Sequence, residues 1–187
     1  VKKVAIAELE GIRKNGLIAI NLDSNDELIC VRPTQGNSDV LIMTENAKTV
    51  RFKEEKVTPT GRLSRGVRGI KLEGDDNVIM MDVVRSKEDQ VLVVSQKGFG
   101  KLTPLTEFPP KGRGTKGILG YKITSKTGKI AVARIIDHPK RDLLLMSQKG
   151  QSIRTSLENI RSAGRVTSGV IIFRLEPGDI VATCAIF

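Results

Sequence analysis

The stretch Gly61-Arg-Leu-Ser-Arg-Gly66-Val-Arg-Gly-Ile-Lys-Leu72 decides the fold, because its pattern occurs four times along the chain. Each time, two glycines five residues apart are followed by a segment in which apolar and polar residues alternate. Alternation with a period of two predicts a half-buried β-strand. The glycine pairs lie at positions 11/16, 61/66, 112/117 and 164/169, which defines a repeat of about 51 residues.

Further strands accompany each glycine pair. A second strand is expected at residues 28–31, 78–84, 130–136 and 180–185, and a hairpin at residues 39–51, 90–101 and 142–154. Brief helical turns fit residues 104–108 and 156–160. Four strands in each repeat predict a propeller-like, all-β domain that spans residues 1–187, with about four blades of four strands. Residues 1–4 match only the second half of a hairpin, so we expect a fragment of a larger disc.

The charge balance points to a polyanionic partner. The 187 residues include 31 Lys and Arg against 21 Asp and Glu, a net charge of +10. No apolar run approaches the roughly 18 residues of a membrane-spanning helix. Aromatic residues make up only 3%, which disfavours the stacking of single-stranded bases. Cys30, Cys184 and His138 are too few for a zinc site, so no metal is expected.

The chain resembles the C-terminal repeats of the A subunit of bacterial DNA gyrase. The resemblance is carried by Arg51-Phe-Lys-Glu-Glu55, the stretch 61–72, Lys97-Gly-Phe-Gly-Lys101, Gly164-Arg-Val-Thr-Ser-Gly169 and residues 12–23. It covers essentially the whole chain. The family's hallmark heptapeptide, Gln-Arg-Arg-Gly-Gly-Lys-Gly, is absent, and its nearest counterpart is Lys111-Gly-Arg-Gly-Thr-Lys-Gly117.

This resemblance implies a β-pinwheel, a disc in which neighbouring blades exchange strands. It implies a non-catalytic domain that binds and wraps duplex DNA and directs a type II topoisomerase toward negative supercoiling. The implied partners are the rest of gyrase A together with the ATPase gyrase B, in an A2B2 complex in the bacterial cytoplasm with the chromosome. No cofactor is expected in this chain, because ATP and magnesium would bind elsewhere in the holoenzyme, and no membrane contact is expected.

A repeated scaffold would turn single basic positions into a curved row of cations, which can neutralise the phosphates of a bent duplex without reading its bases. One such row follows the first glycine of three repeats at Arg62, Arg113 and Arg165. A second row lies on the hairpin return strands at Lys2, Arg51, Lys101 and Arg154. The complete set expected to bind DNA is Lys2, Lys3, Arg13, Lys14, Arg51, Arg62, Arg65, Arg68, Lys97, Lys101, Lys111, Arg113, Lys116, Lys149, Arg154 and Arg165.

Other residues are weaker candidates or structural. Lys71, Lys122 and Arg174 occupy equivalent mid-strand positions that could face outward without touching DNA. Tyr121 aligns with the apolar residues Ile20, Ile70 and Phe173, so we expect all four positions in the core and Tyr121 to be structural rather than a nucleophile. The recurrent acidic residues Asp26, Asp76 and Asp179 are expected to form turns.

Three alternative functions stay open. The A subunit of topoisomerase IV carries similar repeats and would choose the geometry of DNA crossings. A propeller that docks an acidic protein partner would also use a basic surface. An enzyme site in the centre of the disc is disfavoured, because the sequence offers no convergent His, Asp and Ser pattern.

Overall fold

The structure is a computed structural model that describes residues 1–12, 14–138 and 140–187. Three β-hairpins form its framework; each is followed directly by a short 3-10 turn, and a further 3-10 turn precedes the first hairpin. The hairpins are β1 (Asp39–Thr44) with β2 (Lys48–Lys53), β4 (Gln90–Ser95) with β5 (Phe99–Pro104), and β8 (Asp142–Ser147) with β9 (Ser152–Ser156). The turns are η1 (Ile6–Leu9), η2 (Glu54–Lys56), η3 (Leu105–Glu107) and η4 (Leu157–Asn159).

Each hairpin gains an inner strand on one side and, in two cases, an outer strand on the other. The inner strands are β3 (Val78–Val84), β7 (Ile130–Ile136) and β11 (Val181–Ile186). The outer strands are β6 (Ile118–Leu119) and β10 (Val170–Ile171). The antiparallel sheets have the orders β3-β1-β2-β6, β10-β5-β4-β7 and β11-β8-β9.

Strands are exchanged between consecutive repeats. β6 belongs to the repeat that contains β4 and β5, yet it pairs with β2 of the preceding repeat. β10 pairs with β5 in the same way. This exchange confirms the predicted all-β, propeller-like pinwheel.

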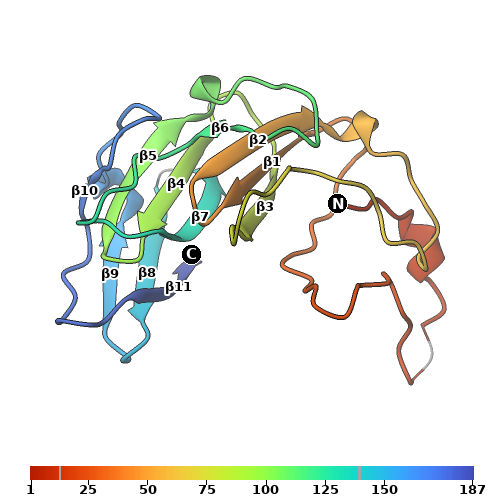
Figure 1. Cartoon of the computed structure of the whole chain (residues 1–187), viewed down its shortest axis with the longest axis horizontal. Helices are drawn as coiled ribbons and strands as arrows, with labels where there is room; N and C mark the ends of the chain where they lie inside the picture. The colour runs from red at the N-terminus through yellow and green to blue at the C-terminus, as the bar shows by residue number, and fades with distance from the viewer. Residues whose placement is uncertain (13, 139) are drawn as a thin grey trace.

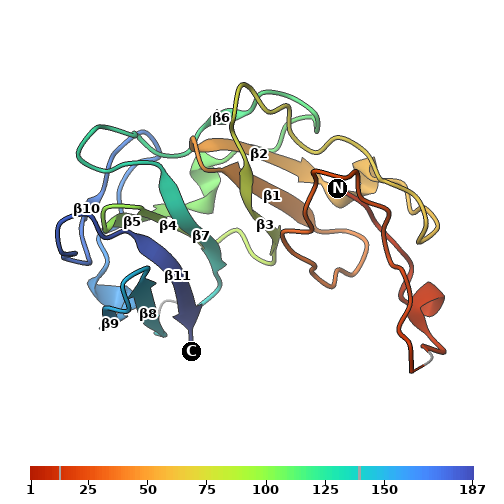
Figure 2. The same ribbon diagram turned by 60° about the horizontal axis from the view of Figure 1, so that its bottom comes forward.

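The sheets pack side by side through their inner strands. β3 lies against β7, and β7 lies against β11. Figures 1 and 2 show the three sheets following one another along an arc, with these strands toward its centre. Of the predicted core positions, Ile70, Tyr121 and Phe173 are buried, whereas Ile20 in the first repeat is only partly buried. Burial of the alternating apolar side chains is the main force that holds such sheets together.

The hairpin turns need a left-handed backbone at one position. Ala47, Gly98 and Gly150 occupy that position with φ between 61° and 88°. The recurrent acidic residues then cap the turns, because Asp76 accepts a hydrogen bond from the Asn46 N–H (3.0 Å). Asp179 accepts one from the Lys149 N–H (3.1 Å) in the same manner. The predicted role of these acidic residues in turns is thus confirmed for both.

The first repeat departs from the prediction. The described residues from 14 to 38 contain no strand, although strands were expected at 16–22 and 28–31. In the later repeats, the strands equivalent to residues 28–31 are β3, β7 and β11, and each pairs with a hairpin. The described residues before 14 form no hairpin with which the first repeat could pair. The segment after the second glycine pair, residues 66–72, also forms no strand, although one was expected there. The segments after the third and fourth pairs form strands of only two residues each, β6 and β10, which are shorter than predicted.

Candidate nucleic-acid interface

The repeated glycine stretches form a row of linked loops. We name residues 61–72, 112–123 and 164–175 the second, third and fourth glycine loops; residues 11–22 are the first. The Gly114 N–H donates to the Gly69 carbonyl (2.6 Å), and the Lys122 N–H donates to the Thr167 carbonyl (3.1 Å). In Figure 1 the loops run from yellow through green to blue along the outside of the sheets. Successive blades therefore bring their glycine loops into contact.

The three arginines that follow the first glycine connect these loops. The Arg62 guanidinium donates to the Ile18 carbonyl (3.0 Å), and Arg113 donates to the Arg68 carbonyl (3.2 Å). Arg165 donates to the Leu119 carbonyl. Each acceptor lies two residues after the second glycine of the preceding loop. These predicted DNA contacts are therefore half-buried cross-links, which keep their charge but have little freedom to move.

Lys101 is a correction to the predicted set. Its side chain is fully buried, and its ammonium donates to the carbonyls of Gly164 (2.7 Å) and Arg165 (2.6 Å). Burial lowers the pKa of Lys101 to about 8; the Glu107 carboxylate opposes this shift and the Arg165 charge adds to it. A lysine held under the fourth loop cannot reach a DNA phosphate.

The predicted row on the return strands was out of register by one residue. Leu92 pairs with Leu102, whereas the equivalent residues Leu41 and Leu144 pair with Arg51 and Arg154. Lys101 is therefore equivalent to Val50 and Ile153 and faces the opposite side of the strand. Lys2 resembles Lys101 in its contacts, because its ammonium donates to the Ser64 carbonyl of the second loop (3.0 Å).

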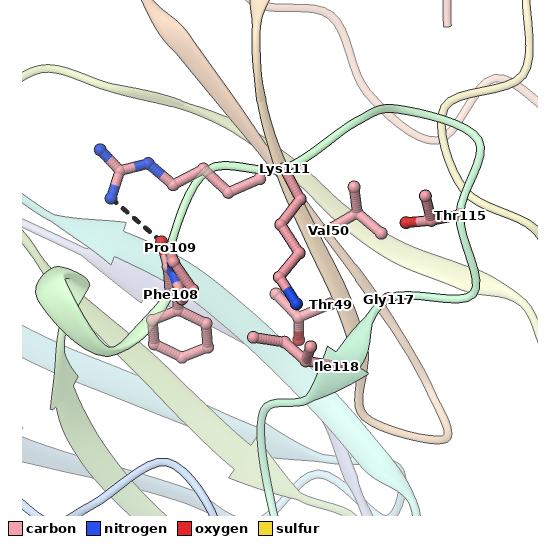
Figure 3. A pocket seen from close by; sticks show the side chains of 9 residues that line it. Thr49, Val50, Phe108, Pro109, Lys111, Thr115, Gly117 and Ile118 are labelled. Atoms are coloured by element: carbon pink, nitrogen blue, oxygen red, sulfur yellow. Dashed lines mark hydrogen bonds between the residues drawn. The ribbon is translucent and has the colours of Figure 1, made fainter.

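Arg51 is also unavailable to DNA, because its guanidinium pairs with Asp39 (2.8 Å) and donates to the Phe108 carbonyl (3.1 Å). Figure 3 shows this bond beside a small hollow under the third loop. The exposed Lys111 side chain points into the hollow toward Thr49, whose buried hydroxyl has no hydrogen-bond partner among the described residues. Lys111 therefore turns inward, and it would have to rotate outward to meet a phosphate.

Carboxylates neutralise several other predicted contacts. Lys3 pairs with Glu54 (3.7 Å) and Arg65 with Asp23 (2.7 Å). Lys116 pairs with Glu73, and Arg154 with Asp142 (2.5 Å). The pairs of Arg65, Lys116 and Arg154 are exposed, and a solvent-exposed pair can exchange its carboxylate for a phosphate at little cost. Arg13 lies outside the described residues.

The remaining predicted contacts are free of carboxylates. Lys14, Arg68, Lys97 and Lys149 are exposed and make no ion pair with any residue that the structure describes. The ammonium groups of Lys97 and Lys149 donate to the carbonyls of Ser125 and Pro177, so these turn lysines are at least partly anchored.

A row of cations more suited to DNA contact than the two predicted rows is formed by the three residues that the sequence indicated as weaker candidates. Lys71, Lys122 and Arg174 each lie five residues after the second glycine, are exposed, and have no ion pair within the described ranges. The backbones of Lys71 and Lys122 lie beside the next loop, because their N–H groups donate to the carbonyls of Thr115 (2.8 Å) and Thr167 (3.1 Å). The sequence signal for this row is the equal spacing of its members from the second glycine. Sequence reasoning undervalued this signal, because an exposed extended segment shows the same alternating pattern as the middle of a strand.

The distribution of charge along the sequence supports the same surface. The four glycine loops, counted as twelve residues each, contain 11 of the 31 Lys and Arg and none of the 21 Asp and Glu. The rest of the chain holds 20 basic and 21 acidic residues, so it is nearly neutral. The whole net charge of the chain is therefore located on one repeated structural element.

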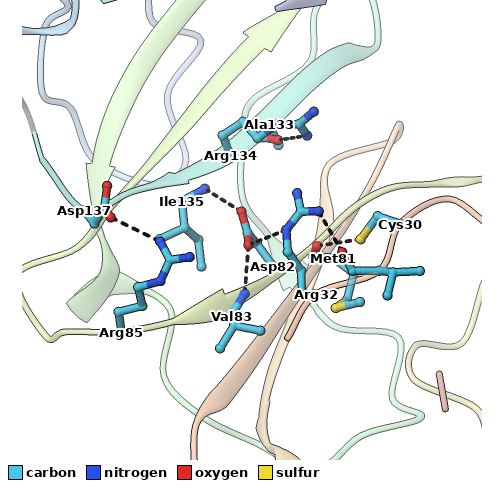
Figure 4. A network of polar contacts seen from close by, with 11 residues as sticks. Cys30, Arg32, Met81, Asp82, Val83, Arg85, Ala133, Arg134, Ile135 and Asp137 are labelled. Carbon is cyan, nitrogen blue, oxygen red and sulfur yellow. Dashed lines mark hydrogen bonds and ion pairs between the residues drawn. The ribbon is translucent and has the colours of Figure 1, made fainter. Parts of the chain in front are cut away.

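The inner strands carry a polar network of a different kind, shown in Figure 4. Asp82 on β3 accepts hydrogen bonds from the Arg32 guanidinium (3.0 Å) and from the Ile135 N–H on β7 (3.4 Å). The partly buried Cys30 donates to the Met81 carbonyl (2.9 Å). Arg85 pairs with Asp137 (3.1 Å). These contacts join the segment around residue 30 to β3, and β3 to β7.

Tyr121 is buried under the fourth loop, where its hydroxyl donates to the Ser168 carbonyl. Burial raises the pKa of the Tyr121 phenol, and a hydrogen bond with Ser95 partly opposes the shift. Its predicted place in the core is confirmed. In the ranges that the structure describes, no three His, Cys, Asp or Glu side chains come together as a metal-binding group. The 3-10 turns of those same ranges are all far too short to cross a membrane.

Comparisons with solved structures agree with this architecture. The C-terminal domain of DNA topoisomerase IV matches 99% of the chain with a TM-score of 0.92 and 23% identity; the chain covers 58% of that domain. The DNA gyrase A C-terminal domain matches 93% of the chain with a TM-score of 0.84 and 24% identity, and 59% of it is covered. At this identity, the two likenesses show the fold.

Sequence comparisons are more specific. The A subunit of DNA gyrase from Staphylococcus epidermidis is 41% identical over 99% of the chain, and that from Salmonella typhimurium is 40% identical over 93%. The chain spans about a fifth of the length of each, 21% and 20%. The family model described as "DNA gyrase C-terminal domain, beta-propeller" matches residues 1–35, 38–85, 89–137 and 141–187. The chain therefore belongs to the family of DNA gyrase C-terminal β-propeller domains.

Proposed function

We propose that the glycine loops bind duplex DNA along its phosphate backbone, without sequence preference, and bend it around the outside of the sheets. The observation that carries this proposal is the location of the net charge, because the loops hold 11 basic and no acidic residues. Cations repeated at equal intervals suit a polymer whose phosphates are evenly spaced. Lys71, Lys122 and Arg174 are the central contacts, and Arg68 and Lys14 extend the row.

Bending has a cost that many contacts must exceed. Smooth curvature of a short duplex costs roughly 1–10 kcal/mol. Neutralising about four to six phosphates would offset it and give a slope of about −4 to −5 in log K against log salt. Several modest contacts on successive blades are suited to this task, since each can act on the next segment of the curve.

The wrapped DNA would serve a larger enzyme. In that role the chain is a non-catalytic part of gyrase A, and it presents a neighbouring duplex segment so that strand passage introduces negative supercoils. The rest of gyrase A together with gyrase B, in an A2B2 complex in the bacterial cytoplasm on the chromosome, would supply cleavage and ATP hydrolysis. The family membership and the gyrase A relatives support this assignment.

A salt series with two sets of variants tests DNA binding. Lys71→Gln, Lys122→Gln and Arg174→Gln together remove three loop cations and should make the salt slope shallower by roughly 0.9 for each lost phosphate contact. The control replaces Lys53, Lys87 and Lys140, which are also exposed and lie outside the loops. Equal weakening by both sets would contradict a specific surface and leave only general attraction to a basic protein.

A ligation assay tests wrapping and separates the alternatives. Nicked plasmid is sealed in the presence of the protein, and its linking number is read on a gel. A linking-number change that the loop variant loses would support wrapping. DNA binding without any change would favour a domain that selects DNA crossings, which is the topoisomerase IV alternative. Absence of duplex binding even at low salt would favour the docking of an acidic protein.

A further inference from the structure

The glycine loops also expose large apolar side chains. Of the 17 such side chains that are exposed among the described residues, seven lie on the second, third and fourth loops, which make up 36 residues of the 187-residue sequence. They are Leu63, Val67, Leu72, Leu119, Val166, Val170 and Ile171. Phosphate binding alone gives no reason to expose apolar surface, which water would disfavour.

Two of these side chains occupy one repeated position. Leu119 and Ile171 lie two residues after the second glycine, at the place that Arg68 takes in the second loop. Their exposed fractions are 42% and 47%. If cations such as Arg68 bring the second loop into contact with DNA, the same position on the two following loops is held by Leu119 and Ile171.

The backbone holds both side chains firmly. Leu119 is on β6 and pairs with Lys48, and Ile171 is on β10 and pairs with Phe99. The Leu119 carbonyl also accepts the Arg165 guanidinium from the next loop. A side chain fixed in this way loses little conformational entropy on binding and can press against a partner.

The charge around these residues indicates what the partner is. The loops contain no acidic residue of their own, although Glu73 pairs with Lys116 and Glu107 accepts a hydrogen bond from the Arg165 N–H. The exposed cations Lys122 and Arg174 follow three residues after Leu119 and Ile171 and have no ion pair among the described residues. The minor groove of DNA combines flanking phosphates with apolar deoxyribose edges, and proteins that bend DNA often insert aliphatic side chains there. An acidic protein surface offers the charges without a regular apolar strip.

We infer that Leu119 and Ile171 contact the minor groove of the bound duplex, one on each blade, while the neighbouring cations hold the phosphates. This inference rests on the proposed DNA binding. The apolar contacts add affinity that does not depend on salt, since they release no counterions. They also favour sequences that bend easily at these points, such as those with TA steps.

Paired substitutions test the inference. Leu119→Ser with Ile171→Ser should raise the dissociation constant about tenfold at every salt concentration, with an unchanged salt slope, as loss of two partly buried aliphatic contacts predicts. The variant should also lose any preference for duplexes with TA steps at one-turn intervals. Met146→Ser is the matched control, because Met146 on β8 has the same exposed fraction of 42% and lies outside the loops. It should bind as the unmodified chain does.

The outcomes distinguish this inference from the proposed function. If the unmodified chain binds duplex DNA and the double variant binds equally well at all salt concentrations, the minor-groove contact is overturned. A shallower salt slope in the double variant would also overturn it, because the substitutions would then act through the cations. Leu119→Met with Ile171→Met should restore binding, since it returns apolar surface of similar size. Failure of the unmodified chain to bind duplex DNA would instead contradict the proposed function itself.

Discussion

Two hairpins of the chain have nearly the same turn and very different surroundings. Both the β4–β5 and the β8–β9 hairpin turn at Ser-Gln-Lys-Gly, residues 95–98 and 147–150. β4 is buried over five successive residues, whereas β8 alternates between buried and more exposed ones. β5 is mostly buried, while β9 has no fully buried residue.

The difference arises from the next repeat. β10 covers the outer edge of β5, whereas no described strand pairs with the outer edge of β9. A β-carbon on Gly98 would lie 2.0 Å from the Phe173 carbonyl oxygen, but one on Gly150 would meet nothing within 4 Å. A hairpin in this fold thus owes much of its burial to a strand that lies far along the sequence.

The largest contrast is expected from alanine at the two turn glycines. Gly98→Ala should lower the free energy of unfolding by more than about 3 kcal/mol, because it adds a clash with the backbone just after β10 to the strain of a positive φ. Gly150→Ala carries only that strain, about 1–2 kcal/mol. Urea unfolding of both variants measures the difference. Equal losses would show that the segment of the next repeat yields easily, which would remove the distinction between the hairpins.

A pH series should separate the same two hairpins. Lys101 is buried under the fourth loop, while its counterpart Ile153 on β9 is half exposed. The pKa of Lys101 is about 8 in the folded chain and 10.5 for a free lysine. Between these values the unfolded chain binds more protons, so the free energy of unfolding should rise with pH by up to about 3 kcal/mol. Below pH 8 Lys101 is charged in the folded chain as well, so the burial of its charge lowers the free energy of unfolding by the full amount.

Lys101→Met identifies the source of that rise. The variant has no ammonium to titrate, so its free energy of unfolding should change less than that of the unmodified chain from pH 8 to 10.5. The stability curves of the variant and of the unmodified chain should therefore converge as the pH rises. Ile153→Met serves as the control, with a pH profile parallel to that of the unmodified chain. If the stability of Lys101→Met instead changed with pH in parallel with that of the unmodified chain, the lowered pKa of a buried Lys101 would be contradicted.

The sequence predicted the features that depend on local pattern. Alternating residues indicated the three hairpins, and aligned positions correctly placed Ile70, Tyr121 and Phe173 in the core, although the aligned Ile20 is only partly buried. Recurrent Asp76 and Asp179 were correctly assigned to turns. Each of these features repeats with the period of the chain, so that one copy supports the interpretation of the others.

Features set by neighbouring repeats were harder to predict. Lys101 lies 11 residues after Gln90 at the start of its hairpin, whereas Arg51 and Arg154 lie 12 residues after Asp39 and Asp142. This one-residue difference places Lys101 on the opposite side of its strand, since side chains alternate along a strand. Ion pairs such as Arg65 with Asp23 join residues 42 positions apart, and no local pattern reveals them. The absence of strands in the described part of the first repeat likewise depends on a pairing partner rather than on its own residues.

The smallest contrast concerns two arginines that occupy equivalent positions in two hairpins. Arg51 on β2 and Arg154 on β9 pair with the aspartate twelve residues before them, but Arg51 is 13% exposed and Arg154 is 65% exposed. Arg51→Gln should cost about 2–3 kcal/mol, because it leaves Asp39 and two carbonyls of the next repeat without a cation. Arg154→Gln should lower the free energy of unfolding by less than about 0.5 kcal/mol, and high salt should remove even this difference by screening the exposed pair. Thermal unfolding at two salt concentrations measures both, and similar costs would mean that coverage by the next repeat adds nothing to an ion pair in this fold.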